Sequence, residues 1–171
     1  MLPEGVIMLV ENKKNKGFYL ESDASLSVKF AEAGFGFDDG GEHLFHPLEV
    51  GYLVKIGKAA IAESPESFIT SQKKKDRLFP FALEAYCSVR SKGRMVRVFM
   101  KGVKYLRVYA PGVGREEERP SQLLCLLPGK LPSVKSISGE VRVAHLARLD
   151  LIIACGTEKE IKFYKISSFN F

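Results

Sequence analysis

Residues 79–109 have the sequence FPFALEAYCSVRSKGRMVRVFMKGVKYLRVY, in which the spacing of the apolar residues changes at Gly93. Before Gly93, apolar residues recur every three or four positions, which predicts an amphipathic helix beginning near Phe79. After Gly93 they alternate with polar residues, which predicts strands near 96–100 and 105–109. A helix followed directly by paired strands indicates a domain of the α/β (α+β) class.

The sequence beyond residue 109 extends this pattern. SQLLCLLP at 121–128 is an apolar run without alternation, which is typical of a buried central strand. A short helix is expected from Ser138 to about Arg148, and GTEKE joins two further predicted strands, 151–155 and 161–167. Residues 73–171 are therefore predicted to form a second domain, with a central mixed sheet flanked by helices.

The sequence before residue 79 predicts a smaller mixed α/β domain over residues 1–72. Apolar residues alternate in three short runs, which predicts strands at 5–10, 17–20 and 25–30. HPLEVGYLVKIGK at 46–58 predicts a helix, with Pro47 at its first position and Gly57 as its C-terminal cap. SQKKKDR at 71–77 is the best candidate for a linker between the domains.

Composition indicates an intracellular globular protein. Hydrophobic residues make up 46% and charged residues 27% of the 171 residues. No apolar run approaches the roughly 20 residues that cross a bilayer, and the N-terminal residues do not resemble a signal peptide. Cys87, Cys125 and Cys155 are widely spaced in apolar surroundings, which favours reduced thiols. We therefore expect a cytoplasmic protein without a membrane partner.

The charge is distributed unevenly along the chain. Residues 1–72 hold 6 Lys and Arg against 11 Asp and Glu, whereas residues 73–171 hold 20 against 9. An acidic half joined to a basic half suggests a polyanionic partner on the basic side. A charge-rich surface of the kind found in thermophiles is the alternative.

The basic residues concentrate between Arg90 and Arg107, where seven Lys and Arg occur without any Asp or Glu. Tyr105 and Tyr109 are predicted to share a strand face with Arg107. Cations neutralise phosphates and aromatic rings stack on unpaired bases, so this mixture suits RNA. An exposed sheet face with Arg–Tyr packing is the alternative. The candidate RNA contacts are Arg94, Arg97, Lys104 and Arg107.

Motifs for metal or cofactor chemistry are weak. His43 and His46 have HxxH spacing without a third ligand nearby, and His145 lies on a largely apolar predicted helix, where a half-buried histidine is common. The glycine-rich AGFGFDDGG at 33–41 lacks the Lys-Ser/Thr of a phosphate loop. We expect neither a metal nor a cofactor. The residues alone predict two small α/β units, one of them basic and compatible with RNA.

Three segments, about 65 of the 171 residues, resemble blocks of the archaeal tRNA-splicing endonuclease family in the same order and spacing. They are HPLEVGYLVKIGK at 46–58, AYCSVRSKGRMVRVFMKGVKYLRVY at 85–109 and VRVAHLARLDLIIACGTEKEIKFYKIS at 141–167. The resemblance implies a nuclease-like fold for the second domain. It also implies cleavage of precursor tRNA at bulge–helix–bulge sites without a metal, giving a 2′,3′-cyclic phosphate and a 5′-hydroxyl.

The family uses a Tyr, a His and a Lys for this cleavage. Tyr109 matches the family tyrosine, but Pro120 stands where the histidine is expected and Leu149 where the lysine is expected. The resemblance therefore implies that this chain alone is inactive. A residual site built from Tyr109, His145 and Arg148 is the alternative, although arginine does not release a proton at neutral pH.

The resemblance also implies a partner. Some archaeal enzymes of this family are heterotetramers of two catalytic and two structural chains, and this chain resembles the structural one. Its last strand would extend the partner's sheet through Ile161, Phe163, Tyr164 and Ile166. Glu158 and Glu160 match an acidic loop that would enter a basic pocket of the opposite subunit; a solvated hairpin tip is the alternative. A stand-alone RNA-binding module without endonuclease activity is the competing hypothesis, and a small-molecule enzyme that uses the glycine-rich loop is a third.

Overall fold

The computed structural model describes residues 6–11, 18–21, 24–99, 102–112 and 119–167. The chain forms two compact units, the first ending at Arg77 and the second beginning at Leu78. Residue 5 of the first predicted strand, residue 17 of the second, and residues 100–101 and 113–118 lie outside the described residues.

The first unit contains a five-stranded mixed sheet in the order β3-β4-β2-β1-β5. Only the β1–β5 pair is parallel, and the other neighbours are antiparallel. The strands are β1 (Ile7–Glu11), β2 (Tyr19–Glu21), β3 (Phe37–Asp39), β4 (Glu42–Phe45) and β5 (Ala59–Ile61).

Aromatic contacts join the helices of this unit to its strands. The helices are α1 (Ala24–Glu32), α2 (Pro47–Lys55) and α3 (Pro65–Lys75). From α1, Phe30 meets Phe45 of β4 edge to face, with ring centroids 6.0 Å apart. From α3, Phe68 meets Tyr19 of β2 at 5.6 Å. These contacts add aromatic pairs to a core whose other buried side chains are mostly aliphatic, among them Leu44, Leu48 and Leu53.

Two expectations for this unit were wrong. Residues 25–30 lie in α1 and not in a strand: Val28, which the strand pattern placed on a buried face, is 58% exposed. Residues 71–75 belong to α3 and do not form a linker. Phe68 and Gln72 are buried one helical turn apart, and the lysines that follow lie where the helix dipole favours positive charge.

Helix α2 begins as the sequence predicted. Pro47 occupies its first turn, and Gly57 just beyond its end has the positive φ of 70° that ends many helices. His46 caps the helix: its Nδ1 accepts a hydrogen bond from the Leu48 N–H at 3.2 Å. The buried Glu49 carboxylate accepts the His46 N–H at 2.9 Å, which completes a capping box.

The stability of the first unit should therefore depend on pH through His46. Burial lowers the pKa of His46 to about 4, below the value of about 6.5 that it has in an unfolded chain. The native state disfavours the charged form, so stability present above pH 6.5 is lost as the pH falls towards 4. Urea unfolding at pH 7 and pH 4.5 should differ by up to about 3 kcal/mol from this group.

Two variants isolate that effect. His46→Asn keeps a side-chain acceptor for the helix cap but cannot take up a proton, so its unfolding should depend less on pH. His145→Asn, at an exposed position of the second unit, should keep the full dependence. Equal pH dependence in both variants would contradict this assignment.

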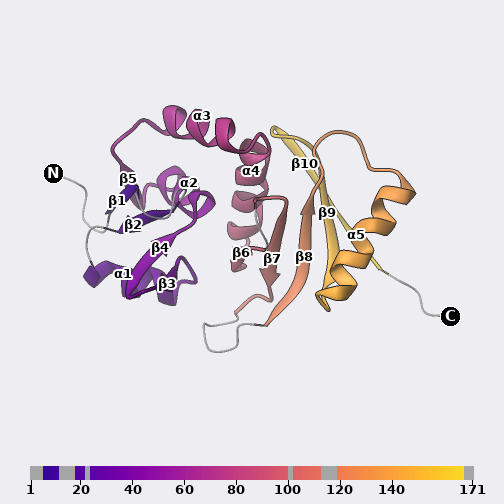
Figure 1. Ribbon diagram of the computed structural model, residues 1–171, viewed down its shortest axis with the longest axis horizontal. Helices are drawn as coiled ribbons and strands as arrows, with labels where there is room; N and C mark the ends of the chain where they lie inside the picture. Colours follow the sequence, from indigo (N-terminus) through magenta and orange to yellow (C-terminus); the bar gives the residue numbers. More distant parts are fainter. Residues whose placement is uncertain (1–5, 12–17, 22–23, 100–101, 113–118, 168–171) are drawn as a thin grey trace. The chain divides into compact units, whose positions relative to one another are not determined.

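The second unit is a central mixed sheet with one helix on each face, as the sequence predicted (Figure 1). The order is β10-β9-β8-β7-β6, and only the β8–β9 pair is parallel. The strands are β6 (Val96–Val98), β7 (Tyr105–Tyr109), β8 (Pro120–Leu126), β9 (Asp150–Thr157) and β10 (Glu160–Ile166). The helices are α4 (Phe79–Arg90) and α5 (Val134–Leu146), and α5 links the parallel strands β8 and β9.

Strand β8 lies at the centre of this sheet, in agreement with its unbroken apolar run. Leu123 and Cys125 face α5 and form a buried cluster with Leu151, Ile153 and Ala144. Helix α5 begins at Val134, four residues earlier than predicted, because the Ser133 hydroxyl caps it by accepting the Ser136 N–H at 3.3 Å. Among the described residues, no helix is long and apolar enough to span a membrane.

Candidate functional site

Three positions singled out in the sequence lie at the same end of the neighbouring strands β7, β8 and β9. Tyr109 ends β7 and pairs with Pro120, which begins the antiparallel strand β8. Leu149 immediately precedes β9, whose first residue pairs with Gln122 of β8. Residues from three separate segments are therefore neighbours, although ten residues lie between Tyr109 and Pro120 and twenty-eight between Pro120 and Leu149.

Tyr109 is buried at this end of the strands. The pairing of β7 with β8 shifts register between Val108 and Tyr109, which interrupts the predicted alternation of faces. Its side chain is 3% exposed, and its main-chain N–H donates to the Met95 carbonyl at 3.0 Å. A phenol so enclosed is poorly placed to reach a backbone phosphate of RNA.

Leu149 packs against the hydrophobic core of the second unit. It is half-buried against the apolar cluster beneath α5, and its N–H donates to the Ala144 carbonyl at 3.0 Å. Arg148 before it has a positive φ of 57°, which turns the chain sharply from α5 into β9. A leucine here completes the packing under the last turn of α5 and offers no charge to a phosphate.

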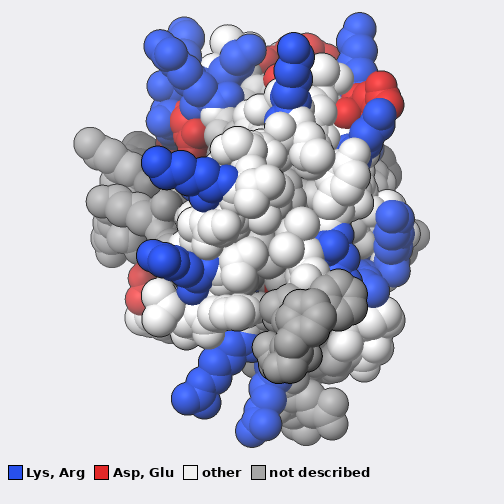
Figure 2. All heavy atoms as spheres, turned by 90° about the vertical axis from the view of Figure 1, so that its right-hand side faces the viewer, with Lys and Arg blue, Asp and Glu red and all other residues white. Residues whose placement is uncertain are grey.

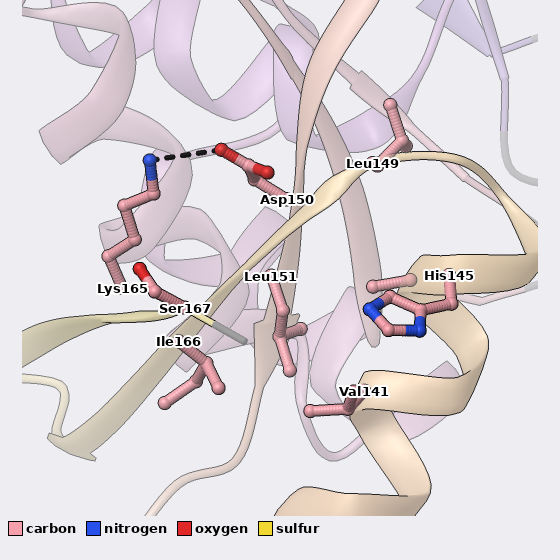
Figure 3. A pocket seen from close by; sticks show the side chains of 9 residues that line it. Val141, His145, Leu149, Asp150, Leu151, Lys165, Ile166 and Ser167 are labelled. Atoms are coloured by element: carbon pink, nitrogen blue, oxygen red, sulfur yellow. Dashed lines mark ion pairs between the residues drawn. The ribbon is translucent and has the colours of Figure 1, made fainter. Parts of the chain in front are cut away.

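A pocket of about 250 Å³ opens beside Leu149, between the end of α5 and strands β9 and β10. Figure 3 shows His145 and Val141 on α5 at one side and the Lys165–Asp150 ion pair, 2.9 Å long, at the other. Apolar and polar side chains both line the pocket, and Tyr109 is not among them. An imidazole and an amine thus lie near Leu149, but the tyrosine needed for the alternative site with His145 and Arg148 does not join them.

The structure divides the four predicted RNA contacts among three environments. Arg97 of β6 and Arg107 of β7 are register partners, so their side chains share one sheet face. Arg94 is near the other face, where its Nη1 donates to the Gln122 side chain at 2.9 Å and it lines a shallow slot beneath α4. Lys104 is paired with Glu140 of α5 at 2.9 Å. The predicted basic stripe is therefore not one continuous surface.

Glu140 forms a polar cluster that sequence reasoning did not find. It is 8% exposed and accepts hydrogen bonds from Lys104 at 2.9 Å and from the Tyr105 hydroxyl at 2.8 Å. Burial alone would raise the pKa of Glu140, but these hydrogen bonds outweigh it and lower that pKa. Burial lowers the pKa of Lys104, and the bonds to Glu140 and Tyr105 more than reverse this.

The same carboxylate affects a neighbouring thiol. Burial, followed by the nearby Glu140 charge, raises the pKa of Cys125, so this thiol stays protonated. A signal for the cluster exists in the sequence: Glu140 is spaced three residues from Ile137 and four from Ala144, on the apolar face of its helix. A charged residue on that face indicates a buried partner.

Strand β10 forms one edge of the sheet. Ile161, Phe163 and Ile166 are half-buried, and Tyr164 is 39% exposed. Glu158 lies exposed in the turn after β9, whereas Glu160 pairs with Lys162 at 3.1 Å.

The two histidines with HxxH spacing have separate local partners. His43 Nδ1 lies 2.7 Å from Asp38 and its Nε2 lies 3.1 Å from the Phe35 carbonyl, while His46 caps α2. The glycine-rich loop leads into the β3–β4 hairpin, and a Cβ at Gly36 would meet His43 Nε2 at 2.3 Å. Within the described ranges, no three His, Cys, Asp or Glu side chains gather as metal ligands.

Comparison with known proteins finds similarity over most of the chain. No protein-family model matches. A tRNA-splicing endonuclease of Thermococcus kodakarensis is 28% identical over 163 residues, covering 87% of this chain and 95% of the relative. One from Thermococcus onnurineus is 26% identical, covering 86% and 89%. One from Pyrococcus abyssi is 25% identical over 173 residues, covering 93% and 99%.

Proposed function

Because the chain belongs to the tRNA-splicing endonuclease family, we propose that it is a structural, non-catalytic subunit of such an enzyme. In this role it binds a catalytic chain, in a two-plus-two assembly, and positions the two catalytic chains on the introns of precursor tRNA.

The observation that carries the proposal is which residues lie together at this end of β7, β8 and β9: Tyr109, Pro120 and Leu149. Attack of a 2′-hydroxyl on the adjacent phosphate needs a base for the hydroxyl, an acid for the leaving oxygen and a cation for the developing charge. Proline cannot move a proton and leucine cannot carry a charge. The remaining tyrosine is buried. The chemistry therefore has to come from another chain.

The exposed edge of β10 supports the proposed partner surface. An unpaired strand edge attracts another chain, and β10 combines such an edge with apolar side chains on both of its faces. Figure 2, which faces the right-hand side of Figure 1, where α5 lies, shows Lys and Arg side chains around a centre of residues that carry no charge.

Glu158 and Glu160 are proposed to choose the partner and its register. They flank the tip of the β9–β10 hairpin, and a basic pocket on a catalytic chain would complement them. Such complementarity contributes more to specificity and association rate than to affinity. Contacts to the precursor tRNA are proposed for Arg94, Arg97, Lys104 and Arg107.

The proposal predicts that Tyr109 is dispensable. Tyr109→Phe in this chain should leave precursor-tRNA cleavage by the mixed complex within about twofold of the wild-type rate, because the hydroxyl takes no part in the proposed chemistry. Its loss should lower the free energy of unfolding of this chain by only about 1 kcal/mol, so the complex should still form. The matched tyrosine-to-phenylalanine change in the catalytic chain should reduce the rate by a factor on the order of 100 or more. A large loss from the Tyr109 variant, with the complex intact, would assign catalysis to this chain.

A stand-alone RNA-binding module is the second candidate, favoured by the excess of basic residues after residue 72. Co-purification discriminates the two functions. A structural subunit should elute with a chain that carries the intact Tyr, His and Lys set, whereas a stand-alone module should remain a monomer that binds RNA by itself.

A further inference from the structure

We propose that the slot beneath α4 binds one unpaired nucleotide, with the base between its apolar walls and the phosphate at its basic rim. The slot has a volume of about 200 Å³ and lies within the second unit. The inference rests on the proposed function, because it names a part of the precursor tRNA that this chain holds.

The walls of the slot come from a helix and from the sheet beneath it. Helix α4 packs on β6 and β8, on the face of the sheet opposite α5 (Figure 1). Val89, in the last turn of α4, lines the slot from the helix. Ile152 of β9 and Phe163 of β10 line it from the sheet, and both are half-buried. A flat ring that enters the slot therefore finds apolar contact on both of its faces.

Gln122 gives the slot a hydrogen-bonding group. It lines the slot from β8, and its Oε1 accepts a hydrogen bond from Arg94 Nη1 at 2.9 Å. Because this bond occupies the amide oxygen and fixes the amide plane, the amide nitrogen is left to donate. A nucleobase offers acceptors of this kind along its edge, and these acceptors are accessible when the base is unpaired.

Two cations lie at the rim without an acidic partner in the part of the chain that the structure describes. Lys92 is exposed, and its Nζ lies 5.9 Å from the centroid of the Phe163 ring. The Arg94 guanidinium donates to the neutral amide of Gln122. None of the residues described as lining the slot is an Asp or a Glu. A phosphate at this rim meets two positive charges without displacing a carboxylate.

This combination favours a nucleotide over an apolar side chain of another protein. A side chain of that kind would fill the walls, but it would leave the Gln122 amide and the two cations without an acceptor, at a cost in free energy. A nucleotide supplies a flat ring, an acceptor edge and an anion together. An unpaired nucleotide in RNA and a free nucleoside monophosphate share this chemistry, so the experiment includes both.

The experiment uses the full chain, alone, and two fluorescent RNAs that differ only at the bulges. One RNA contains a bulge–helix–bulge, and the other has abasic residues in place of the bulged nucleotides, which keeps every phosphate. Fluorescence anisotropy should show that the wild type binds the first RNA about tenfold more tightly, because stacking of a base contributes on this scale.

Variants of the slot should remove this preference. Val89→Trp fills the slot, so both RNAs should bind with the affinity of the abasic one. Ser138→Trp adds the same ring at an exposed position of α5 and should keep the tenfold preference. K92Q/R94Q should weaken the binding of both RNAs about tenfold at low salt and should reduce the salt slope. If Val89→Trp melts early, Phe163→Leu tests the same slot and should at least halve the preference.

The outcomes separate this inference from the proposed function. Equal binding of the two RNAs by the wild type would overturn the slot as an RNA site. If AMP, but not inorganic phosphate, then raises the melting temperature of the wild type and not of Val89→Trp, the slot belongs to a free nucleotide. A normal RNA preference in Val89→Trp together with lost assembly would overturn the nucleotide site and assign the slot to a partner protein. A lost preference in a chain that never associates with a catalytic partner would support the slot and overturn the structural-subunit proposal.

Discussion

If the proposed function is correct, Tyr164→Asp at the edge of β10 is expected to separate the chain from the proposed catalytic partner and to abolish cleavage by the mixed complex. Tyr164 is 39% exposed, so the variant chain should fold normally. In the complex, a carboxylate would be buried against apolar side chains without a partner, which costs several kcal/mol. The expected loss of affinity is about 100-fold or more, the scale of an interface hot spot.

Two measurements check this result together. Size-exclusion chromatography should show the variant eluting apart from the catalytic chain, and cleavage of precursor tRNA should fall with the amount of complex. Ser138→Asp introduces the same carboxylate at an exposed position of α5 and serves as the matched control, with normal assembly. Normal assembly of the Tyr164 variant would exclude β10 as the partner surface.

Glu140→Ala is expected to destabilise the second unit by about 2–4 kcal/mol, because it leaves Lys104 and Tyr105 without their buried acceptor. Thermal unfolding should show the loss directly. Glu158→Ala, in an exposed turn, should change the free energy of unfolding by less than about 0.5 kcal/mol. An equal effect of both substitutions would mean that the Glu140 cluster contributes nothing to folding.

The pH dependence of this contribution has a definite sign. The pKa of Glu140 is lowered in the folded chain, so its stabilisation is present above the ordinary glutamate pKa and is lost as the pH falls below it. The Glu140→Gln variant should show less of this acid sensitivity, since an amide does not titrate.

Elements whose own residues specify them were predictable from the sequence. The apolar run of β8 and the proline and glycine that bound α2 are local signals, and both elements formed as expected. The prediction for residues 25–30 was wrong because the four-residue spacing of Leu26 and Phe30 fits one face of a helix as well as one face of a strand. The prediction of a linker at 71–77 was wrong because it relied on the polar composition of the segment. Residues 71–75 continue α3, whose buried face contains Phe68 and Gln72.

The candidate site was only partly accessible to sequence reasoning. The resemblance to the family identified Tyr109, Pro120 and Leu149, and the pairing of β7, β8 and β9 places them at the same end of these strands. The burial of Tyr109 could not be foreseen, since it follows from a register shift in β7. The division of the basic residues depends on which strand face each occupies and on Glu140, thirty-six residues beyond Lys104.

Cleavage of precursor tRNA by the purified chain, alone and mixed with a catalytic chain of the family, tests the central claim most directly. The account predicts no 2′,3′-cyclic phosphate product above background from the chain alone, and efficient cutting by the mixture. Efficient cutting by the chain alone would contradict it, since Pro120 and Leu149 would then be no obstacle to the chemistry.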